Sequence, residues 1–413
     1  MAKLKELFHK AIAKIGAIIF QNPSSKLFVI GVTGTKGKST VLELINYILE
    51  TEGNATALIS SVRIKVGEEE KENLTGNTMP GRAFIQRFLS RAVKAGCKYA
   101  LIETTSQGVL QHRHKHIDFD VAVLTNVHPE HIESHGSFEN YRNAKIQFFK
   151  DIAVGSKKAK KYFVLNRDDP NTPFFVGALK QSGYREEDII FFSSADLKDW
   201  ELKMIGEFNR ANVAAAHAVA KKILNIDEGL IREIVGKFDG VPGRLEFVRR
   251  HPFTVVVDYA HTPHSLEAVY RTLKDLKPKK MICVLGSAGG GRDKWKRPVL
   301  GKIASELCDE VILTNEDPYD EKPETIISEI GQGIPDGKYT AVIDRKEAIR
   351  KAVTDVKHGD LIVITGKGSE AFLHLENDKK IEWNEVEVVK DVLTELGYKE
   401  EVLKEQFDET KDY

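Results

Sequence analysis

A glycine-rich segment near the start of the chain carries the strongest chemical signal in the sequence. It reads Gly31-Val32-Thr33-Gly34-Thr35-Lys36-Gly37-Lys38-Ser39-Thr40 and stands between an apolar run and a helix-like one. Glycines let backbone N–H groups close around phosphates, and the positive end of the following helix favours negative charge. Lys38 would reach the terminal phosphates of a nucleotide, and the Ser39 hydroxyl would bind Mg²⁺. The segment therefore predicts a P-loop, although its glycine spacing departs from the standard motif.

Candidate metal ligands follow the next predicted strands. Glu103 ends one apolar run, and His131 lies in the polar segment 128–136. Phosphoryl transfer needs cations that neutralise charge on the γ-phosphate, and these side chains can hold such ions. Either residue alone is more often structural, but together after a P-loop they indicate a metal site. Lys145 comes later, and its spacing alone indicates a lysine on a helix surface.

Two polar loops in the second half of the chain are further candidates. The first is Asp258-Tyr259-Ala260-His261, which combines an acid, an aromatic ring and an imidazole at the end of an apolar run. The second, from Gly286 to Asp293, is rich in glycine and contains Arg292. An arginine in such a loop binds a phosphate or a carboxylate. Because glycine loops are common, each of these signals is weak by itself.

Apolar runs alternate with helix-like segments, which predicts α/β architecture with mostly parallel sheets. In the first half the predicted strands are Leu27–Val32, Tyr99–Glu103, Val121–Asn126 and Tyr162–Asn166, with a helix over Val41–Glu50. In the second half they are Thr254–Val257, Met281–Leu285, Glu310–Thr314 and Leu361–Thr365. The polar candidates follow these strands, where α/β sheets bind ligands.

The segment Val241–Arg244 separates the two series of strands and is the predicted joint between domains. We expect an N-terminal extension over 1–26, a central P-loop ATPase domain over 27–243 and a C-terminal Rossmann-like α/β domain over 244–413. A chain of 413 residues is long enough for two or three domains of ordinary size.

Composition excludes several classes of protein. Lys+Arg and Asp+Glu balance at 61 each, so overall charge does not draw the chain to nucleic acid or to an anionic membrane. Cys97, Cys283 and Cys308 lie far apart, which argues against a zinc site or a disulfide framework and favours a reducing cytosol. No segment resembles an export or transmembrane signal, so a cytoplasmic location is expected.

The N-terminal segment has its own pattern. Apolar residues recur at helical spacing, with Lys3, Lys5, Lys10 and Lys14 between them; the apolar residues are Leu4, Leu7, Phe8, Ile12, Ile15, Ile18 and Ile19. The uninterrupted apolar run Ile15–Phe20 is too short to span a membrane. An amphipathic helix packed on the protein or on a protein partner is favoured over a helix on a membrane surface.

The order of these motifs resembles the Mur ligases, and most closely the MurE-type tripeptide synthetases of peptidoglycan synthesis. The resemblance runs from about Leu27 to about Val389. It implies a ligase that uses ATP and Mg²⁺, with two ions expected, to activate a carboxylate as an acyl phosphate. The amine of an amino acid then attacks that acyl phosphate to form an amide. Arg244 lies in a segment that resembles the family's hinge, which implies that the C-terminal domain closes over the nucleotide.

The resemblance also carries roles to particular residues. Those implied for the nucleotide are Gly34, Thr35, Lys36, Gly37, Lys38, Ser39, Thr40, Asn209, Asn212, Arg244, Asp258, Tyr259 and His261. Those implied for the metal are Ser39, Glu103, His131 and Lys145, the last carbamylated. Lys38, His131, Lys145 and Arg292 are the implied catalytic residues. Those implied for the substrates are Asn77, Thr78, Arg292, Asp293, Asp317, Gly366 and Glu370.

Several departures from the family pattern keep alternatives open. Lys36 replaces an asparagine, Ser369 replaces a histidine, and Glu316-Asp317-Pro318-Tyr319 replaces a DNPR segment, so an arginine clamp for a carboxylate is lost. About 26 residues precede the first strand, so we expect no N-terminal UDP-binding domain. Folylpolyglutamate synthetase also lacks such a domain. A ligase that acts on a folate or on an amino-acid polymer is therefore the alternative to a MurE-type enzyme. A P-loop partner subunit without activity is a third hypothesis, against which the metal-site residues argue.

Overall fold

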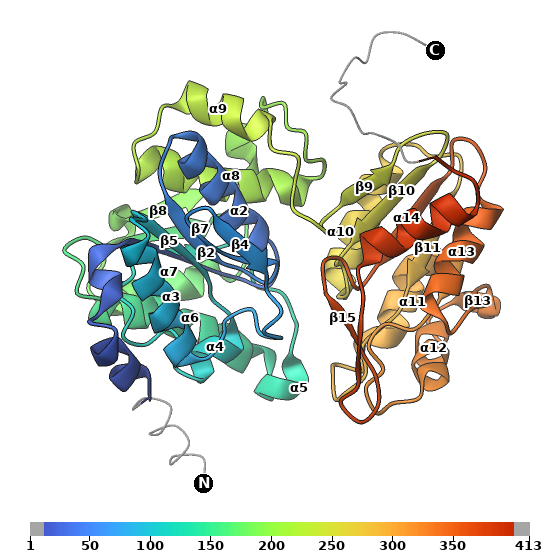
Figure 1. Cartoon of the computed structure of the whole chain (residues 1–413), viewed down its shortest axis with the longest axis horizontal. Coiled ribbons are helices and arrows are strands. Elements are labelled where there is room, and N and C mark those ends of the chain that lie inside the picture. The colour runs from blue at the N-terminus through green and yellow to red at the C-terminus, as the bar shows by residue number, and fades with distance from the viewer. Residues whose placement is uncertain (1–11, 400–413) are drawn as a thin grey trace. The chain divides into compact units, whose positions relative to one another are not determined.

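A computed structural model describes residues 12–399 of the protein. The chain forms two compact units, residues 1–241 and 242–413, which divide between Val241 and Pro242 (Figure 1). Each unit is an α/β fold built around its own mostly parallel sheet. The predicted fold class is confirmed.

An eight-stranded sheet forms the centre of the first unit. In spatial order its strands are β4 (Glu69–Glu72), β3 (Arg63–Val66), β2 (Thr56–Ile59), β5 (Tyr99–Glu103), β1 (Phe28–Thr33), β6 (Val121–Leu124), β7 (Tyr162–Asn166) and β8 (Ile189–Phe192). Strands β2, β5, β1, β6, β7 and β8 are parallel, and β3 and β4 extend one edge in antiparallel fashion. The strands predicted at Tyr99–Glu103 and Tyr162–Asn166 are confirmed with these bounds.

Helices cover both faces of this sheet. One hydrophobic core joins it to α2 (Lys38–Thr51), α8 (Glu207–Lys222) and α9 (Glu228–Gly236). The other joins it to α3 (Arg82–Lys94), α4 (Ser106–Leu110), α6 (Phe138–Gly155) and α7 (Thr172–Gln181). The shorter helices are α5 (Ile132–His135), η1 (Pro23–Lys26), η2 (Glu186–Asp188) and η3 (Ser194–Leu197). Because β1 is buried on both faces, it appears in the sequence as an unbroken apolar run rather than an alternating one.

The register of the central strands positions the P-loop. Val32 of β1 pairs with Glu103 of β5, and Thr33 pairs with Leu124 of β6. The carboxyl ends of these three strands therefore meet at one edge of the sheet. Residues far apart in the sequence, from the P-loop, the end of β5 and the segment after β6, are brought together there.

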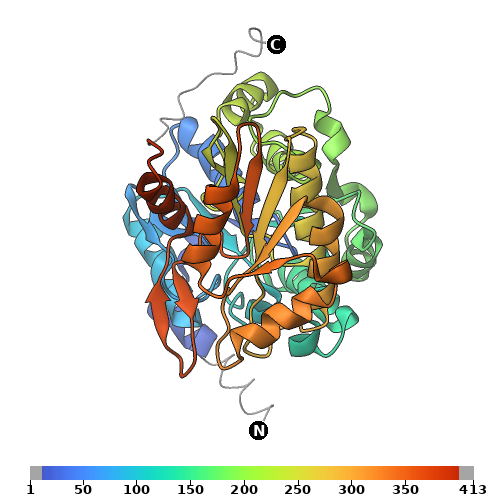
Figure 2. The ribbon, with the colours of Figure 1, turned by 90° about the vertical axis from the view of Figure 1, so that its right-hand side faces the viewer.

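The second unit contains a six-stranded sheet. Its spatial order is β13 (Thr340–Ala341), β12 (Glu310–Leu313), β11 (Met281–Leu285), β14 (Leu361–Thr365), β10 (Thr254–Asp258) and β9 (Glu246–Arg249). All neighbours are parallel except β9, which runs antiparallel to β10. Figure 2 shows these strands side by side, coloured from yellow to red. A separate hairpin consists of β15 (Phe372–His374) and β16 (Lys380–Glu382).

Helices also cover this second sheet. Residues of α13 (Arg345–Asp355) and α14 (Glu385–Glu395) share one hydrophobic core with its strands. Figure 1 shows α10 (Pro263–Lys274) and α11 (Lys296–Leu307) along the opposite face. The remaining helices are α12 (Pro323–Gly331) and η4 (Pro335–Gly337).

The N-terminal part of the described chain is helical over residues 12–19. Its small residues Ala13 and Ala17 are buried, and a Cβ added to Gly16 would lie 3.6 Å from Cγ of Gln86 on α3. The predicted helical residues Leu4, Leu7 and Phe8 lie outside the described residues. Between residues 12 and 399, no helix has the length and apolar character needed to cross a membrane.

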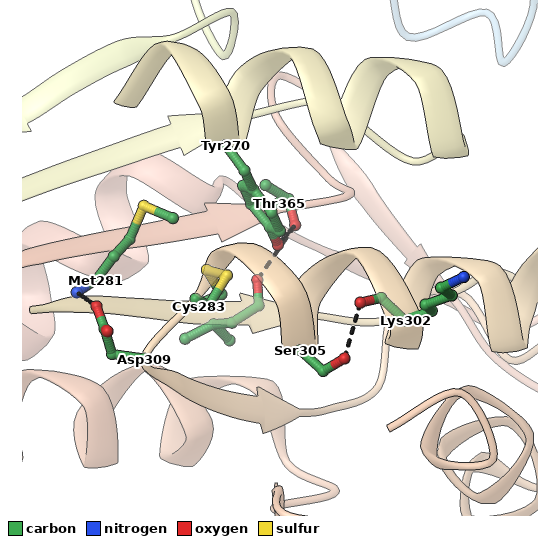
Figure 3. Close-up of a disulfide and its surroundings, with 9 residues drawn as sticks. Tyr270, Met281, Cys283, Lys302, Ser305, Asp309 and Thr365 are labelled. Carbon is green, nitrogen blue, oxygen red and sulfur yellow. Dashed lines mark hydrogen bonds between the residues drawn. A yellow bond between two sulfur atoms is a disulfide. The ribbon is translucent and has the colours of Figure 1, made fainter. Parts of the chain in front are cut away.

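The cysteines differ from the sequence-based expectation. Cys283 in β11 forms a disulfide with Cys308, which directly follows α11 (Figure 3). The two residues are 25 positions apart, but their Cα atoms lie 6.1 Å apart, because α11 runs back along the strand that precedes it. Cys97 is a free, buried thiol. The expectation of no disulfide was therefore wrong, and the cysteines no longer favour a reducing compartment.

We expect the variant Cys308→Ser to be less stable than the wild type by about 3 kcal/mol, because the disulfide closes a loop of this length in the unfolded chain. The measurement is thermal unfolding followed by calorimetry, with and without dithiothreitol. Reductant should lower the melting temperature of the wild type and leave that of Cys308→Ser unchanged. A Cys97→Ser variant that keeps the reductant effect is the control, and a wild type indifferent to reductant would contradict the prediction.

Candidate active site

The P-loop links the end of β1 to the start of α2 and depends on two glycines. Gly34 and Gly37 have φ angles of 153° and 82°. A Cβ on Gly34 would lie 1.9 Å from Oγ1 of Thr125, and one on Gly37 would lie 2.2 Å from Oδ1 of Asn212. Conformation and space therefore both require glycine. Helix α2 has no side-chain cap at Gly37, so its first N–H groups point toward the place where a phosphate would bind.

Residues after β6 hold the loop in shape, and sequence reasoning missed them. The Lys36 N–H donates to Oδ1 of Asn126 at 2.9 Å, and Nδ2 of Asn126 donates to the Lys36 carbonyl at 3.0 Å. Oγ1 of Thr125 donates to the same carbonyl at 2.6 Å. The side chain of Lys38 folds back, and its Nζ donates to the Thr35 carbonyl at 2.9 Å. A polar pair at a strand end was the signal in the sequence that could have identified these two residues.

Ser39 and Glu103 form the oxygen-rich part of the site. Oγ of Ser39 donates to Oε2 of Glu103 at 2.8 Å, and the Ser61 N–H donates to the same oxygen at 2.9 Å. Nζ of Lys38 lies 3.9 Å from Oε1 of Glu103. Both Ser39 and Glu103 are buried. A hydroxyl beside a carboxylate is a pair of ligands that suits Mg²⁺, which keeps water and phosphate oxygens as its other ligands.

Lys145 is buried in α6 beneath the P-loop. Its Nζ donates to the Gly34 carbonyl at 2.6 Å and lies 4.5 Å from the centre of the Tyr141 ring. Burial lowers the pKa of Lys145 well below its usual value, and the charge of Lys38 lowers it further. Both effects favour the neutral form of the amine. Spacing alone had indicated a surface lysine, whereas the structure buries this side chain at the nucleotide loop.

His131 lies in the same region. Its ring centre is 5.9 Å from that of Tyr141, whose hydroxyl is 3.1 Å from Oγ1 of Thr35. His131 is an exposed residue, but the protein atoms that cover part of its ring lower its pKa; Glu130 opposes this effect, and Lys36 adds to it. Lys36, which replaces the family's asparagine, forms an ion pair with Glu130 at 3.0 Å.

The described chain contains no group of three or more His, Cys, Asp or Glu side chains that could hold a metal ion by themselves. A metal at this edge would therefore need Ser39 and the phosphates as well as Glu103. The Ser39–Glu103 pair fits such an ion.

The other predicted residues of the first unit fall in two places. Asn212 of α8 contacts the P-loop at Gly37, and its Nδ2 donates to Oδ1 of Asn209 at 3.3 Å. Asn77 and Thr78 lie in the loop before α3. There the Arg113 guanidinium donates to Oδ1 of Asn77 at 3.4 Å. The structure thus ties Asn77 to the segment after α4.

A buried lysine organises the strand ends of the second unit. Nζ of Lys367 lies 2.9 Å and 3.0 Å from the two carboxylate oxygens of Asp317 and 2.7 Å from Oε2 of Glu370. It also donates to the Phe372 carbonyl at 2.7 Å. The Lys367 side chain is fully buried. Sequence reasoning identified Asp317 and Glu370 but missed the lysine that joins them.

The charge of Lys367 influences the ionisation of Glu370. Burial would raise the pKa of Glu370, yet 40% of that side chain is exposed, so the attraction of Lys367 is stronger and the pKa is lowered. Oε1 of Glu370 also accepts from the Tyr259 hydroxyl at 2.7 Å. Burial, and then the charge of Glu370, raise the pKa of Tyr259 well above its usual value. Tyr259 therefore stays a neutral hydrogen-bond donor.

The predicted nucleotide residues of the second unit surround Tyr259. The Arg244 guanidinium lies 4.1 Å from the centre of the Tyr259 ring, and the His261 ring lies 4.5 Å from it. Asp258 serves the backbone, since its carboxylate accepts from the N–H groups of Leu245 and Ala260, both at 2.6 Å. Arg244, Tyr259 and His261 thus present a cationic and aromatic surface, whereas Asp258 fixes the turn that carries it.

Arg292, Asp293 and Gly366 are the remaining predicted substrate residues of the second unit. The Arg292 guanidinium donates to the Tyr319 hydroxyl at 3.1 Å, and the Tyr319 ring stacks on that of His374 at 5.0 Å. Asp293, one residue further on, is buried. Gly366 has a φ of 113°, and a Cβ there would lie 2.4 Å from Oε2 of Glu316. That oxygen is buried without a hydrogen-bond partner in the described part of the chain, and burial raises the pKa of Glu316.

A P-loop between a central strand and a helix, above a buried carboxylate and amine, defines a nucleotide-using α/β enzyme. The sequence matches the Mur ligase middle domain over residues 32–220 and the Mur ligase glutamate ligase domain over residues 243–368. The chain therefore belongs to the Mur ligase family, and it is an ATP-dependent ligase that forms amide bonds.

Individual relatives agree with this assignment. The UDP-N-acetylmuramoyl-L-alanyl-D-glutamate–2,6-diaminopimelate ligase of Halalkalibacterium halodurans is 36% identical over 94% of this chain and 82% of its own length. A solved structure of a ligase with the same name is 28% identical over 90% of this chain and 79% of that chain, with a TM-score of 0.59. Folylpolyglutamate synthase of Mycobacterium tuberculosis is 16% identical, with a TM-score of 0.71 over 95% of this chain and 96% of its own, and shares the fold.

We expect Lys367→Met to destabilise the second unit by about 3–5 kcal/mol, because it leaves the buried Asp317 carboxylate without its cation. The control is Lys351→Met, which removes a surface ion pair with Asp355. Thermal unfolding should show that this variant changes stability by less than about 0.5 kcal/mol.

The same pair of variants tests a pH dependence. Because the folded protein lowers the pKa of Glu370, the ionised carboxylate stabilises the fold at pH values above its usual pKa of 4.5, and this stabilisation is lost as the pH falls through the lower pKa of the folded state. The two lysine variants should therefore converge in stability in acid, and equal stability at neutral pH would contradict the role of Lys367.

Proposed function

We propose that this Mur ligase joins an amino acid to the carboxylate of a muramyl peptide in the manner of MurE-type enzymes. The observation that carries the proposal is the cluster of Lys38, Ser39, Glu103 and Lys145 around one phosphate loop, of which the last three are buried. The acceptor is inferred from the relative in Halalkalibacterium halodurans, whose name specifies a muramoyl-alanyl-glutamate substrate and which is similar over both units.

The proposed reaction has two steps. The acceptor carboxylate attacks the γ-phosphorus of ATP, and the bond to the bridging oxygen breaks to release ADP and leave an acyl phosphate. The amine of the amino acid then attacks the carbonyl carbon, loses a proton to a base or to water, and expels inorganic phosphate. Lys38 and the N–H groups at the start of α2 stabilise negative charge on the transferring phosphoryl group.

Two Mg²⁺ ions suit the ligands on this edge. Ser39 and Glu103 would hold one, and His131 with a carbamylated Lys145 would hold the other. Such ions supply positive charge that neutralises the phosphate oxygens. The lowered pKa of Lys145 supports the modification, since only a neutral amine attacks carbon dioxide to form a carbamate.

The second unit is proposed to bind the incoming amino acid through Asp317, Glu370 and Arg292. The amine is cationic before reaction and suits the two carboxylates, whereas a carboxylate suits the arginine. Tyr319 replaces the arginine of the diaminopimelate-type segment, so the distal end of the amino acid meets an aromatic ring rather than a second guanidinium. A cytoplasmic location is proposed, because ATP and nucleotide-linked precursors are available there.

The first test is release of inorganic phosphate from ATP by the purified protein. We expect release that requires both UDP-N-acetylmuramoyl-L-alanyl-D-glutamate and one member of a panel of amino acids. Lys38→Ala should lower the rate about 100- to 1,000-fold, because the transferring phosphate loses a cation. Lys351→Ala on the surface of the second unit is the control. Release that instead requires folate and glutamate would replace the proposed acceptor, and full activity in Lys38→Ala would contradict the phosphate site.

A second test addresses Lys145. Lys145→Met keeps the buried volume and the P-loop, so we expect ATP binding close to that of the wild type and a rate lowered about 100-fold. After removal of dissolved carbon dioxide, bicarbonate should restore activity to the wild type and have no effect on Lys145→Met. Mass spectrometry under mild conditions should detect the added carboxylate. A wild type equally active with and without bicarbonate would refute carbamylation while leaving the ligase assignment intact.

A further inference from the structure

The helix over residues 12–19 packs on the first unit with its small residues. Ala13 and Ala17 are 1% and 2% exposed, and a Cβ added to Gly16 would lie 3.7 Å from Cα of Ala83 and 3.6 Å from Cγ of Gln86. Alanine and glycine on this face let the helix lie close to α3. The inner face of the helix is therefore already satisfied by the protein.

The opposite face exposes the large apolar side chains. Ile15, Ile18 and Ile19 are 54%, 62% and 67% exposed, and their spacing places them on one strip of the helix. An amphipathic helix that only stabilised the fold would bury its isoleucines and expose its alanines. The sequence favours a helix that packs through its apolar stripe. The structure instead buries the alanines and exposes the isoleucines.

Basic side chains lie near the junction between this helix and the rest of the first unit. Lys14, Lys115 and Lys157 act together on His116, whose pKa is lowered first by burial and then by these charges. His116 lies beside the helix, because its carbonyl accepts from Nε2 of Gln86 at 3.0 Å and Gln86 borders Gly16. The lysines therefore gather around the place where the helix meets the domain. Lys115 also pairs with Asp151 at 2.8 Å.

The sequence before the described residues continues the same composition. It adds Leu4, Leu7 and Phe8 and lysines at positions 3, 5 and 10, with Glu6 as its acidic residue. The whole chain has a formal net charge of zero, so this positive charge is local. Apolar residues and lysines interleaved in this way are typical of segments that lie in the interface of an anionic membrane.

We propose that the helix over residues 12–19, with the lysines around His116, binds the surface of an anionic lipid membrane. Ile15, Ile18 and Ile19 would enter the acyl boundary, and Lys14, Lys115 and Lys157 would meet the lipid phosphates. A second copy of the chain is the competing occupant of this face, and the experiment below distinguishes it from lipid. The proposal concerns a surface of the first unit and does not depend on the ligase substrate.

The experiment is flotation of the full chain with lipid vesicles. One set contains phosphatidylcholine alone, and the other contains added phosphatidylglycerol. We expect binding to the anionic vesicles that weakens with salt, since surface charges are screened. The triple variant Ile15→Ser, Ile18→Ser and Ile19→Ser should lower the partition coefficient about tenfold or more, because three exposed isoleucines lose their apolar contact.

A matched triple variant controls for the loss of apolar surface in general. It changes Leu276, Ile343 and Ile381 to serine; these residues are 47%, 44% and 44% exposed in the second unit. This variant should bind anionic vesicles like the wild type. ATP-dependent phosphate release and melting temperature, measured for both triples, should stay near wild-type values, which separates loss of the surface from loss of the fold.

Three outcomes would overturn the proposal. The first is a wild type that does not float with anionic vesicles, and the second is a triple isoleucine variant that floats as well as the wild type. The third is a dimer in light scattering that the isoleucine variant abolishes, together with an absence of lipid binding; this result would assign the face to a second copy of the chain. Lipid binding lost only in the isoleucine variant would support the assignment.

Discussion

The phosphate site depends on how closely the backbone of the P-loop approaches its neighbours. At Gly34 and Gly37 there is no space for a side chain, because Thr125 and Asn212 already occupy the positions where a Cβ would stand. Thr125 and Asn126 directly follow β6, whereas Asn212 belongs to α8, so segments from across the first unit shape one short loop. A phosphate can then be bound by backbone N–H groups in a preorganised geometry, without the cost of ordering the loop on binding.

Two buried lysines show how the surroundings decide the chemistry of one residue type. Lys145 meets a backbone carbonyl and further cations, so its pKa is lowered well below the usual value. Lys367 meets two carboxylates, and although burial acts to lower its pKa, they raise it. The first lysine is therefore suited to react as a neutral amine, and the second is a fixed cation that holds the polar cluster of the second unit together.

The N-terminal helix illustrates a limit of reading amphipathic patterns. Its sequence has two low-polarity faces, one of alanine and glycine and one of isoleucine, and hydrophobicity alone selects the isoleucine face for burial. Close packing against α3 instead selects the small residues, because they let the two helices approach. The larger face is left exposed, and lysines from distant segments come together near His116, where the helix meets the rest of the unit. Both features exist only in the folded chain.

The sequence by itself determined the fold class, the P-loop and the family, because these depend on local patterns: apolar strands, glycines at fixed spacing, and polar residues at strand ends. It did not reveal the Cys283–Cys308 disulfide, the role of Lys367, the anchoring by Asn126 or the burial of Lys145. The disulfide, the Lys367–Asp317 pair, the Asn126–Lys36 hydrogen bonds and the Lys145–Gly34 hydrogen bond join residues that are 25 to 111 positions apart in the chain. Only the tertiary structure sets their distances and removes water from around their charges, because packing brings together segments whose separation in sequence carries no signal.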